Sequence, residues 1–406
     1  MAPAAVLTEP PLPDEVMEDT FLRLDDAADL ARASAACTSF RRVVRGRRFL
    51  RRFRSLHPPP VLCLGGLNRS AADGYFHFRP VEPPHRSASA ARALVQAADF
   101  TFSFLPDPKS WFVRDARDGR VLLSRHIITR VITAADRDIT DTLGDLMVAD
   151  PLHCRYVQIP SIPGDLVPTR RHYEDEMKFE PFLAPACEDD EDLSFRVIYN
   201  VMSQYKVVTF VFSLVTEEWR HATSISFLPH RLIHNPTKLM RYCVRSCFCW
   251  AHRDDPRTYM LVLDPLEMKF SVAALLLDKP VARERLAIVD AGEDKLGVLT
   301  FSYYYRMLDL YCKTWRNNVV CTEDWQYDKT IPLPEHNSSW KISGAGAPEG
   351  YLLMRAYPRF EQQPKQWYFT LDTKTLLFER MYESGQDVDF DLLYASFPPP
   401  LSPPSI

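Results

Sequence analysis

Residues 12–44 read LPDEVMEDTFLRLDDAADLARASAACTSFRRVV, and in this chain only that stretch has a residue order that predicts a specific role. Pro13 suits the start of a helix, and the acidic residues directly after it complement the positive N-terminal dipole. Met17, Phe21 and Leu24 then recur at i, i+4 and i+7. This spacing predicts a first helix with one apolar stripe.

Two further helices are expected behind the first. Asp29 is a suitable N-cap for the second helix, which carries apolar side chains at helical spacing: Leu30, Ala33, Cys37 and Phe40. The third spans Arg47 to Arg54 and adds Phe49, Leu50 and Phe53. Because roughly forty residues are too few for a self-sufficient core, a partner surface is the economical interpretation. A helical cap packed on the following domain stays open as the alternative.

The residue order also resembles a known family. Leu-Pro-Asp-Glu-Val at 12–16, Phe-Leu-Arg-Leu at 21–24, Asp-Leu-Ala at 29–31 and Cys-Thr-Ser-Phe-Arg at 37–41 follow one another as in an F-box. The run FLRRFRSLHPPPVL at 49–62, followed by a strand-rich body, is similar to the large plant F-box families. The resemblance implies an adaptor that docks on a Skp-family protein, which bridges to a cullin scaffold and a RING subunit.

Nine positions match those with which the family contacts its Skp-family partner. They are Leu12, Pro13, Val16, Phe21, Leu22, Leu24, Leu30, Cys37 and Phe40. Phe40 stands where the family more often has Trp, and Ala36 where it more often has Val. Both residues are smaller than the usual ones and would present less apolar area to the partner.

Composition narrows the compartment and the partners. The net charge of −4 over 406 residues gives no reason to expect a nucleic-acid or membrane partner. Nine scattered cysteines are typical of a reduced compartment, and the first thirteen residues do not form a signal peptide. We therefore expect an intracellular protein, cytoplasmic or nuclear. Eight arginines between Arg41 and Arg54 are interpreted as a solvated helix face or a surface for acidic groups, rather than a nuclear-import or phosphate-binding segment.

Beyond His57-Pro58-Pro59-Pro60, short segments rich in Val, Ile, Phe, Tyr and Trp alternate with turn residues and predict strands. Strand-turn-strand units recur at 113–121, 212–219, 263–270, 310–315 and 371–378. The turns at Ser213, Asp264, Cys312 and Asp372 are 51, 48 and 60 residues apart. A hairpin at this spacing is typical of a propeller blade with an outer strand pair. We expect six or seven blades, with a β-sandwich or two stacked β domains as the rival architecture.

The expected organisation is therefore multidomain, a small all-α three-helix F-box followed by a large all-β domain. We place a disordered N-terminus at 1–9, the F-box helical module at 10–56, a propeller-like substrate-binding domain at 60–390 and a proline-rich tail at 391–406. Pro163 to Asp192, with four prolines and a run of five acidic residues, is expected to be an exposed loop.

Candidate chemistry is sparse. Cys243, Cys247 and Cys249 with His252 could bind zinc, but Cys247 and Cys249 would share one face of a strand and are better explained as core residues. The histidines His221, His230 and His234 lie in a loop-like stretch. His172 with Glu174, Asp175 and Glu176 falls in the expected exposed loop, and Tyr303, Tyr304 and Tyr305 are expected to be at least partly core. Because no nucleophile or phosphate-loop motif is present, we expect no catalytic residue, metal or cofactor.

The expected function is that of a substrate-recognition adaptor in a Skp-cullin-F-box ubiquitin ligase. It would hold a target protein, whose identity the sequence leaves open, near the ubiquitin-charged enzyme. Two alternatives remain: a propeller enzyme or small-molecule binder whose F-box only controls its turnover, and a scaffold that binds the Skp-family protein without cullin.

Overall fold

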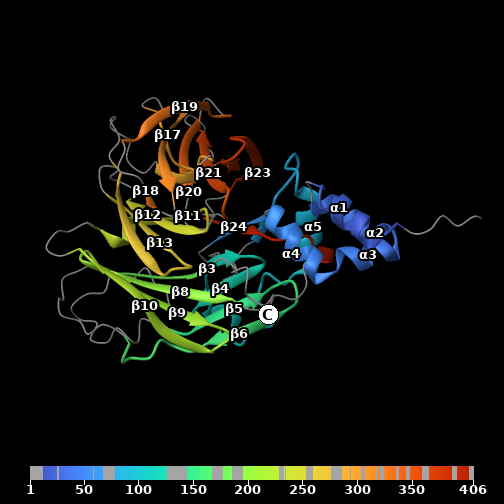
Figure 1. Ribbon diagram of the computed structural model, residues 1–406, viewed down its shortest axis with the longest axis horizontal. Coiled ribbons are helices and arrows are strands. Elements are labelled where there is room, and N and C mark those ends of the chain that lie inside the picture. The colour runs from blue at the N-terminus through green and yellow to red at the C-terminus, as the bar shows by residue number, and fades with distance from the viewer. Residues whose placement is uncertain are drawn as a thin grey trace, which may run out of the picture.

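The computed structural model describes residues 12–24, 27–57, 59–66, 78–125, 144–166, 177–184, 195–227, 233, 235–252, 259–275, 286–292, 294–302, 307–316, 319–320, 324–334, 338–343, 348–358, 365–385 and 391–401. These residues form a group of short helices beside a ring of β-sheets (Figure 1). In this part of the chain, no helix is both long and apolar enough to cross a membrane.

The helical module contains α1 (Asp14–Phe21), α2 (Ala27–Ala36), α3 (Thr38–Val44) and α4 (Arg47–Leu56). The predicted starts after Pro13 and at Arg47 are confirmed. The expected three-helix arrangement is wrong, because the chain breaks at Cys37 and divides the second helix. Cys37 is extended, and its sulfur accepts a hydrogen bond from the Phe40 N–H, which caps α3. Asp29 consequently lies in the first turn of α2 and not at its N-cap.

Apolar side chains from all four helices form the core of the module. Phe21 packs edge-to-face on Phe49 with ring centroids 6.3 Å apart, and Phe49 stacks on Phe53 at 6.0 Å. Phe397 and Leu401, from the other end of the chain, are buried in the same cluster. The module therefore does not enclose its core with its own residues.

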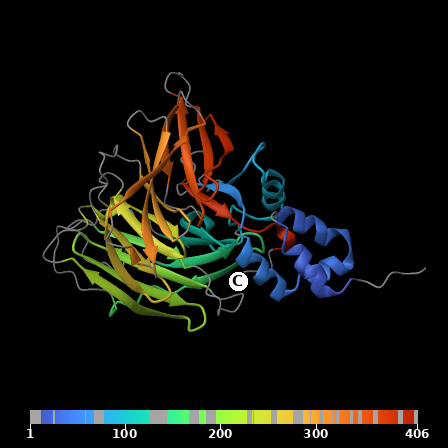
Figure 2. The same cartoon turned by 45° about the horizontal axis from the view of Figure 1, so that its top comes forward.

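Six sheets make up the β body, which is a six-bladed propeller (Figures 1 and 2). Blade 1 contains β24 (Leu392–Ala395), β1 (Val61–Gly65) and β2 (Phe78–Pro80). Blade 2 contains β3 (Phe112–Arg117), β4 (Arg120–Ser124), β5 (Leu146–Asp150) and β6 (Arg155–Ile159). Blade 3 contains β7 (Lys178–Leu183), β8 (Arg196–Met202), β9 (Lys206–Ser213) and β10 (Glu218–Ser226).

The remaining three blades follow in chain order. Blade 4 contains β11 (Leu239–Val244), β12 (Cys247–His252), β13 (Tyr259–Asp264) and β14 (Lys269–Ala274). Blade 5 contains β15 (Leu286–Asp290), β16 (Lys295–Phe301), β17 (Met307–Arg316), β18 (Val319–Val320) and β19 (Gln326–Pro332). Blade 6 contains β20 (Ser338–Ser343), β21 (Tyr351–Pro358), β22 (Gln366–Asp372) and β23 (Phe378–Ser384).

The first strands of the blades lie at the centre of the ring, where β24 contacts β3, β3 contacts β7, and β11 contacts β15. The apolar core fills the seams between blades. Val148 of blade 2 and Val197 of blade 3, for example, belong to one buried cluster. Helix α5 (Ala88–Ala97) packs on β1 and β2. Three short 3₁₀ helices complete the described elements: η1 (Pro108–Ser110), η3 (Pro236–Lys238) and η4 (Pro399–Leu401).

The predicted recurrence of hairpins is confirmed for the outer strand pairs β9–β10, β13–β14 and β22–β23. The unit predicted at 113–121 is instead the inner pair β3–β4. The hairpin predicted at 310–315 is wrong, since these residues belong to the continuous strand β17. Residues 310–315 contain no Gly, Pro, Asp or Asn, so nothing in them favours a turn.

Two boundaries predicted from composition are also wrong. The stretch 163–192 was expected to be loop, yet β7 lies within it and forms the first strand of blade 3. The predicted tail at 391–406 is also wrong for its first part, because β24 pairs with β1 and closes the ring, with Leu393 opposite Leu64. Both predictions relied on proline content and charge. Whether the short apolar segments inside these stretches form strands depends instead on pairing with strands that are distant in the sequence.

Candidate functional site

The nine residues that match the F-box partner surface fall into three groups. Four are exposed: Leu12, Pro13, Val16 and Cys37. Leu24 and Phe40 are half-buried, and Phe21, Leu22 and Leu30 are buried in the module's own core. Leu12 and Val16 are 61% and 47% exposed, so two large apolar side chains face solvent within five residues at the start of α1.

Acidic side chains of α1 form ion pairs with arginines of α3 and α4. Asp14 and Glu15 occupy the first turn of α1. The Arg42 guanidinium on α3 donates to the Asp14 carboxylate at 2.7 Å, and Arg52 on α4 lies 3.6 Å from Asp19. Both pairs are exposed, so each contributes little to stability. Most described side chains of the arginine run are exposed, as predicted for a solvated face, but Arg54 is half-buried.

A second cluster of polar groups lies at the centre of the propeller and was missed by the sequence analysis. One Asp115 carboxylate oxygen accepts the N–H of Leu183 on β7 at 2.8 Å. The other oxygen accepts from the Arg241 guanidinium on β11 at 2.9 Å. The Asp115 and Arg241 side chains are 8% and 6% exposed. The Arg241 guanidinium also lies over the Phe182 ring at 4.4 Å, so one buried ion pair joins three blades.

Lys178 and Glu180 extend this cluster along β7, with 3.1 Å between ammonium and carboxylate. Lys178 donates to the carbonyl of Leu239 at 2.8 Å, and the Trp250 indole N–H donates to Glu180 at 2.7 Å. Burial lowers the pKa of Lys178, although Glu180 opposes that effect. Burial by itself would raise the pKa of Glu180, but Lys178, Arg241 and the Trp250 hydrogen bond outweigh it and lower that pKa.

These charges could have been noticed in the sequence. Glu180 and Arg241 each interrupt a short apolar segment of strand type, where a charged side chain is unusual, and Asp115 follows the strand-type residues Phe112 and Val113. Their convergence could not be predicted, because it depends on how three separate blades are placed around one axis. Chemically, the cluster pairs each described charge with another, so it first of all neutralises itself.

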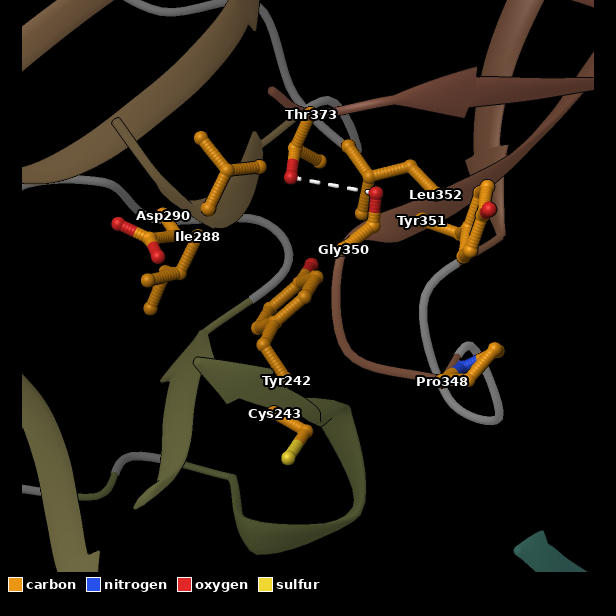
Figure 3. A pocket seen from close by; sticks show the side chains of 10 residues that line it. Tyr242, Cys243, Ile288, Asp290, Pro348, Gly350, Tyr351, Leu352 and Thr373 are labelled. Atoms are coloured by element: carbon orange, nitrogen blue, oxygen red, sulfur yellow. Dashed lines mark hydrogen bonds between the residues drawn. The ribbon is translucent and has the colours of Figure 1, made fainter. Parts of the chain in front are cut away.

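A shallow pocket lies between blades 4, 5 and 6 (Figure 3). It encloses about 280 Å³ including open solvent, and its lining consists of Tyr242, Cys243, Ile288, Val289, Asp290, Pro348, Gly350, Tyr351, Leu352 and Thr373. The Tyr242 hydroxyl donates to the Leu286 carbonyl at 2.6 Å, and the Thr373 hydroxyl donates to the Gly350 carbonyl at 3.2 Å. Since these hydroxyls already have partners and the space is small, the pocket offers little to a drug-sized ligand.

The cysteines considered as zinc ligands take different faces of one hairpin. Cys247 pairs with Val244 and Cys249 with Tyr242, all on one face, whereas Cys243 pairs with Phe248 on the other. Cys247 and Cys249 are buried among apolar side chains, as predicted. Burial raises the pKa of Cys247 to about 12 and that of Cys249 well above its ordinary value, which disfavours thiolate ligands. Within the described ranges, no three His, Cys, Asp or Glu side chains gather as a metal site.

Several other candidates lie outside the described residues. They are His172 with Glu174, Asp175 and Glu176, the histidines His230 and His234, the tyrosines Tyr303, Tyr304 and Tyr305, and the His252 side chain. His221 lies on β10 and is exposed.

No protein-family model matches the chain, and no curated protein matches its sequence. Among solved structures, the SapL1 lectin in complex with alpha methyl fucoside matches with a TM-score of 0.35 and 7% identity, over 81% of this chain and 97% of the lectin. The β-propeller domain of Cps50 (Swd1) from Myceliophteria thermophila matches with a TM-score of 0.32 and 6% identity, over 71% of this chain and 77% of that domain. A post-proline cleaving enzyme from Rickettsia typhi matches with a TM-score of 0.32 and 9% identity, over 69% of this chain and 37% of the enzyme. Matches at this level carry no information about activity.

Proposed function

We propose that the protein is a substrate-recognition adaptor of a Skp-cullin-F-box ubiquitin ligase. The helical module would dock on the Skp-family protein, and the propeller would hold the target. The observation that carries the proposal is the exposed apolar start of α1, where Leu12 and Val16 face solvent next to a module whose core is formed by other residues. These positions match the opening of the F-box.

The proposed mechanism is proximity and requires no covalent step on this chain. A target held by the propeller would stay near the ubiquitin-charged enzyme, which raises the effective concentration of its lysines there. The buried members of the matched set, Phe21, Leu22 and Leu30, would act by keeping the exposed members in position.

The first test replaces Leu12 and Pro13 by Ala in the full chain. We expect loss of co-purification with a Skp-family protein, because the change removes apolar area from the most exposed end of the module. Leu56→Ala is the matched control, since Leu56 is 57% exposed in the same module but lies outside the matched set. Unchanged recovery of the Skp-family protein with the Leu12/Pro13 variant would overturn the proposal.

A chain beginning at Pro60 is the second test and should lose both the Skp-family protein and cullin. The point variants are the cleaner experiment, because removing the module would expose Phe397 and Leu401. Recovery of the Skp-family protein without cullin from the intact chain would favour the scaffold alternative.

The second candidate function is a propeller that binds a small molecule, with the F-box controlling its turnover. The convergence of Asp115, Lys178, Glu180 and Arg241 at the centre of the ring favours it, because ligand sites contain a few convergent polar groups among aromatic side chains such as Phe182. A metabolite that raises the unfolding temperature of the native chain, but not of the Glu180→Gln variant, would support this alternative. The mutual pairing of these four side chains is the reason to rank it second.

A further inference from the structure

The segment from Leu392 to Leu401 belongs to two parts of the molecule at once. Its first half is β24, which pairs with β1 and closes the ring of blades. Tyr394 is 1% exposed, and its hydroxyl donates to the Gly119 carbonyl of blade 2 at 2.9 Å. This half therefore joins blade 1 to its neighbour as well as to its own sheet.

The second half of the segment lies in the helical module. Phe397 and Leu401 are 6% and 1% exposed and share a cluster with Leu30, Phe49 and Phe53. The Phe397 and Phe53 rings are 6.1 Å apart, and η4 contacts both α2 and α5. In Figure 2 the red stretch that follows β24 lies beside the blue helices.

One arginine fixes this half to the last helix of the module. The Arg54 guanidinium donates to the Leu401 carbonyl at 3.1 Å and lies over the Phe397 ring at 5.3 Å. Directly before this point, the Ser396 N–H donates to the Pro60 carbonyl at 3.2 Å, where the module leads into β1. The module and the ring are thus connected at both ends of the chain, and only three residues separate Phe397 from Leu393 in the ring.

We propose that residues 392–401 couple the folding of the helical module to closure of the propeller. Detaching β24 would pull Phe397 and Leu401 out of a module too small to keep its core without them. Coupling of this kind is reciprocal, so whatever stabilises the module also stabilises ring closure. If the proposed adaptor function holds, a Skp-family protein bound to the module would tighten the propeller that holds the target.

The coupling itself is tested without any partner. In the full chain, Phe397→Ala with Leu401→Ala should speed amide exchange at least about tenfold both in residues 14–56 and in β24, because two buried apolar side chains are truncated. All seven tryptophans lie between Trp111 and Trp367, so their fluorescence reports whether the ring remains folded. Leu377→Ala is the control, since that side chain is 59% exposed on blade 6.

An unchanged amide exchange rate in the module would overturn the proposal. Faster exchange in the module with an unchanged exchange rate in β24 would also overturn it. If the double variant does not fold, Arg54→Gln replaces it. That variant removes the hydrogen bond to Leu401 and the contact with Phe397 while leaving both apolar side chains, and it should raise exchange in the same two regions. If amide exchange in the Arg54→Gln variant became faster only in α4, that result would contradict the coupling.

The dependence on the adaptor function is tested separately by adding a Skp-family protein. Binding that slows exchange of β24 in the native chain, but not in the double variant, is the expected result. Binding with no change in β24 would overturn the coupling. Absence of binding to the native chain would overturn the proposed function and leave the outcome of the partner-free experiment standing.

Discussion

Asp115 joins three blades through one carboxylate, which accepts from β7 and from Arg241 on β11. A buried ion pair of this kind adds little net stability compared with an apolar pair, because both charges lose their hydration. Each partner is nevertheless needed while the other is present. The pair therefore specifies how blades 2, 3 and 4 are placed relative to one another.

Replacing Arg241 by Met should lower the free energy of unfolding by about 3–5 kcal/mol, since it leaves the Asp115 charge buried without its cation. Combining Arg241→Met with Asp115→Asn should cost less than the sum of the single changes, because no orphaned charge remains. Urea unfolding followed by tryptophan fluorescence measures both. A single variant within about 1 kcal/mol of the native chain would show that the pair does not hold the blades.

At the scale of elements, one turn recurs between the third and fourth strands of the blades. Asp150, Asp264 and Asp372 each accept two backbone N–H groups from the residues that follow, and Ser213 occupies the same place in blade 3. Four residues later the backbone is left-handed in every case, at Cys154, Glu217, Met268 and Leu376. Three of the five units predicted from the sequence, at 212–219, 263–270 and 371–378, contain this turn, and an aspartate side chain closes it at Asp264 and Asp372.

Asp264→Ala should lower the free energy of unfolding by about 1–3 kcal/mol, because the N–H groups of Leu266 and Glu267 lose their acceptor. Asp328→Ala is a suitable control, since that side chain is 40% exposed on the edge strand β19. We expect the control to stay within about 0.5 kcal/mol of the native chain. Equal unfolding curves for the two variants would show that the hydrogen bonds of Asp264 do not stabilise the fold.

At the scale of the whole molecule, blade 1 and blade 6 meet at a buried histidine. His85, in the connection after β2, lies with its Nε2 3.7 Å from the Glu379 carboxylate on β23, and its Nδ1 accepts the Ser87 N–H at 3.2 Å. Arg86 donates to the same carboxylate at 2.8 Å. Burial lowers the pKa of His85, and Arg86 adds to this effect while Glu379 opposes it.

The seam should therefore weaken in mild acid. His85 binds a proton less readily in the folded chain than in the unfolded one, so the unfolded state takes up more protons once the pH falls below about 6.5. The free energy of unfolding should then decrease as the pH is lowered through that value, and His85→Gln should show a shallower decrease. Unfolding free energies measured between pH 5 and pH 8 test this, and parallel curves for the two chains would contradict it.

Features that depend on neighbouring residues could be predicted from residue order and spacing. Helical spacing locates α1 and α4, alternation with turn residues locates most strands, and the recurring hairpin indicates a propeller. The resemblance of residues 12–41 to an F-box also needs only residue order. These signals are local, because a helix or a hairpin is formed by residues close together in the chain.

Features that depend on distant partners became visible only in the folded chain. Closure of the ring pairs Val61 with Ala395, the central ion pair joins Asp115 to Arg241, and the module is completed by Phe397 and Leu401. The folded chain also shows that Leu12 and Val16 are exposed whereas Leu30 is buried, although all three are apolar residues of one motif. The physical reason is that the spacing of residues records their local conformation, whereas burial and pairing depend on which remote segments the fold brings beside them.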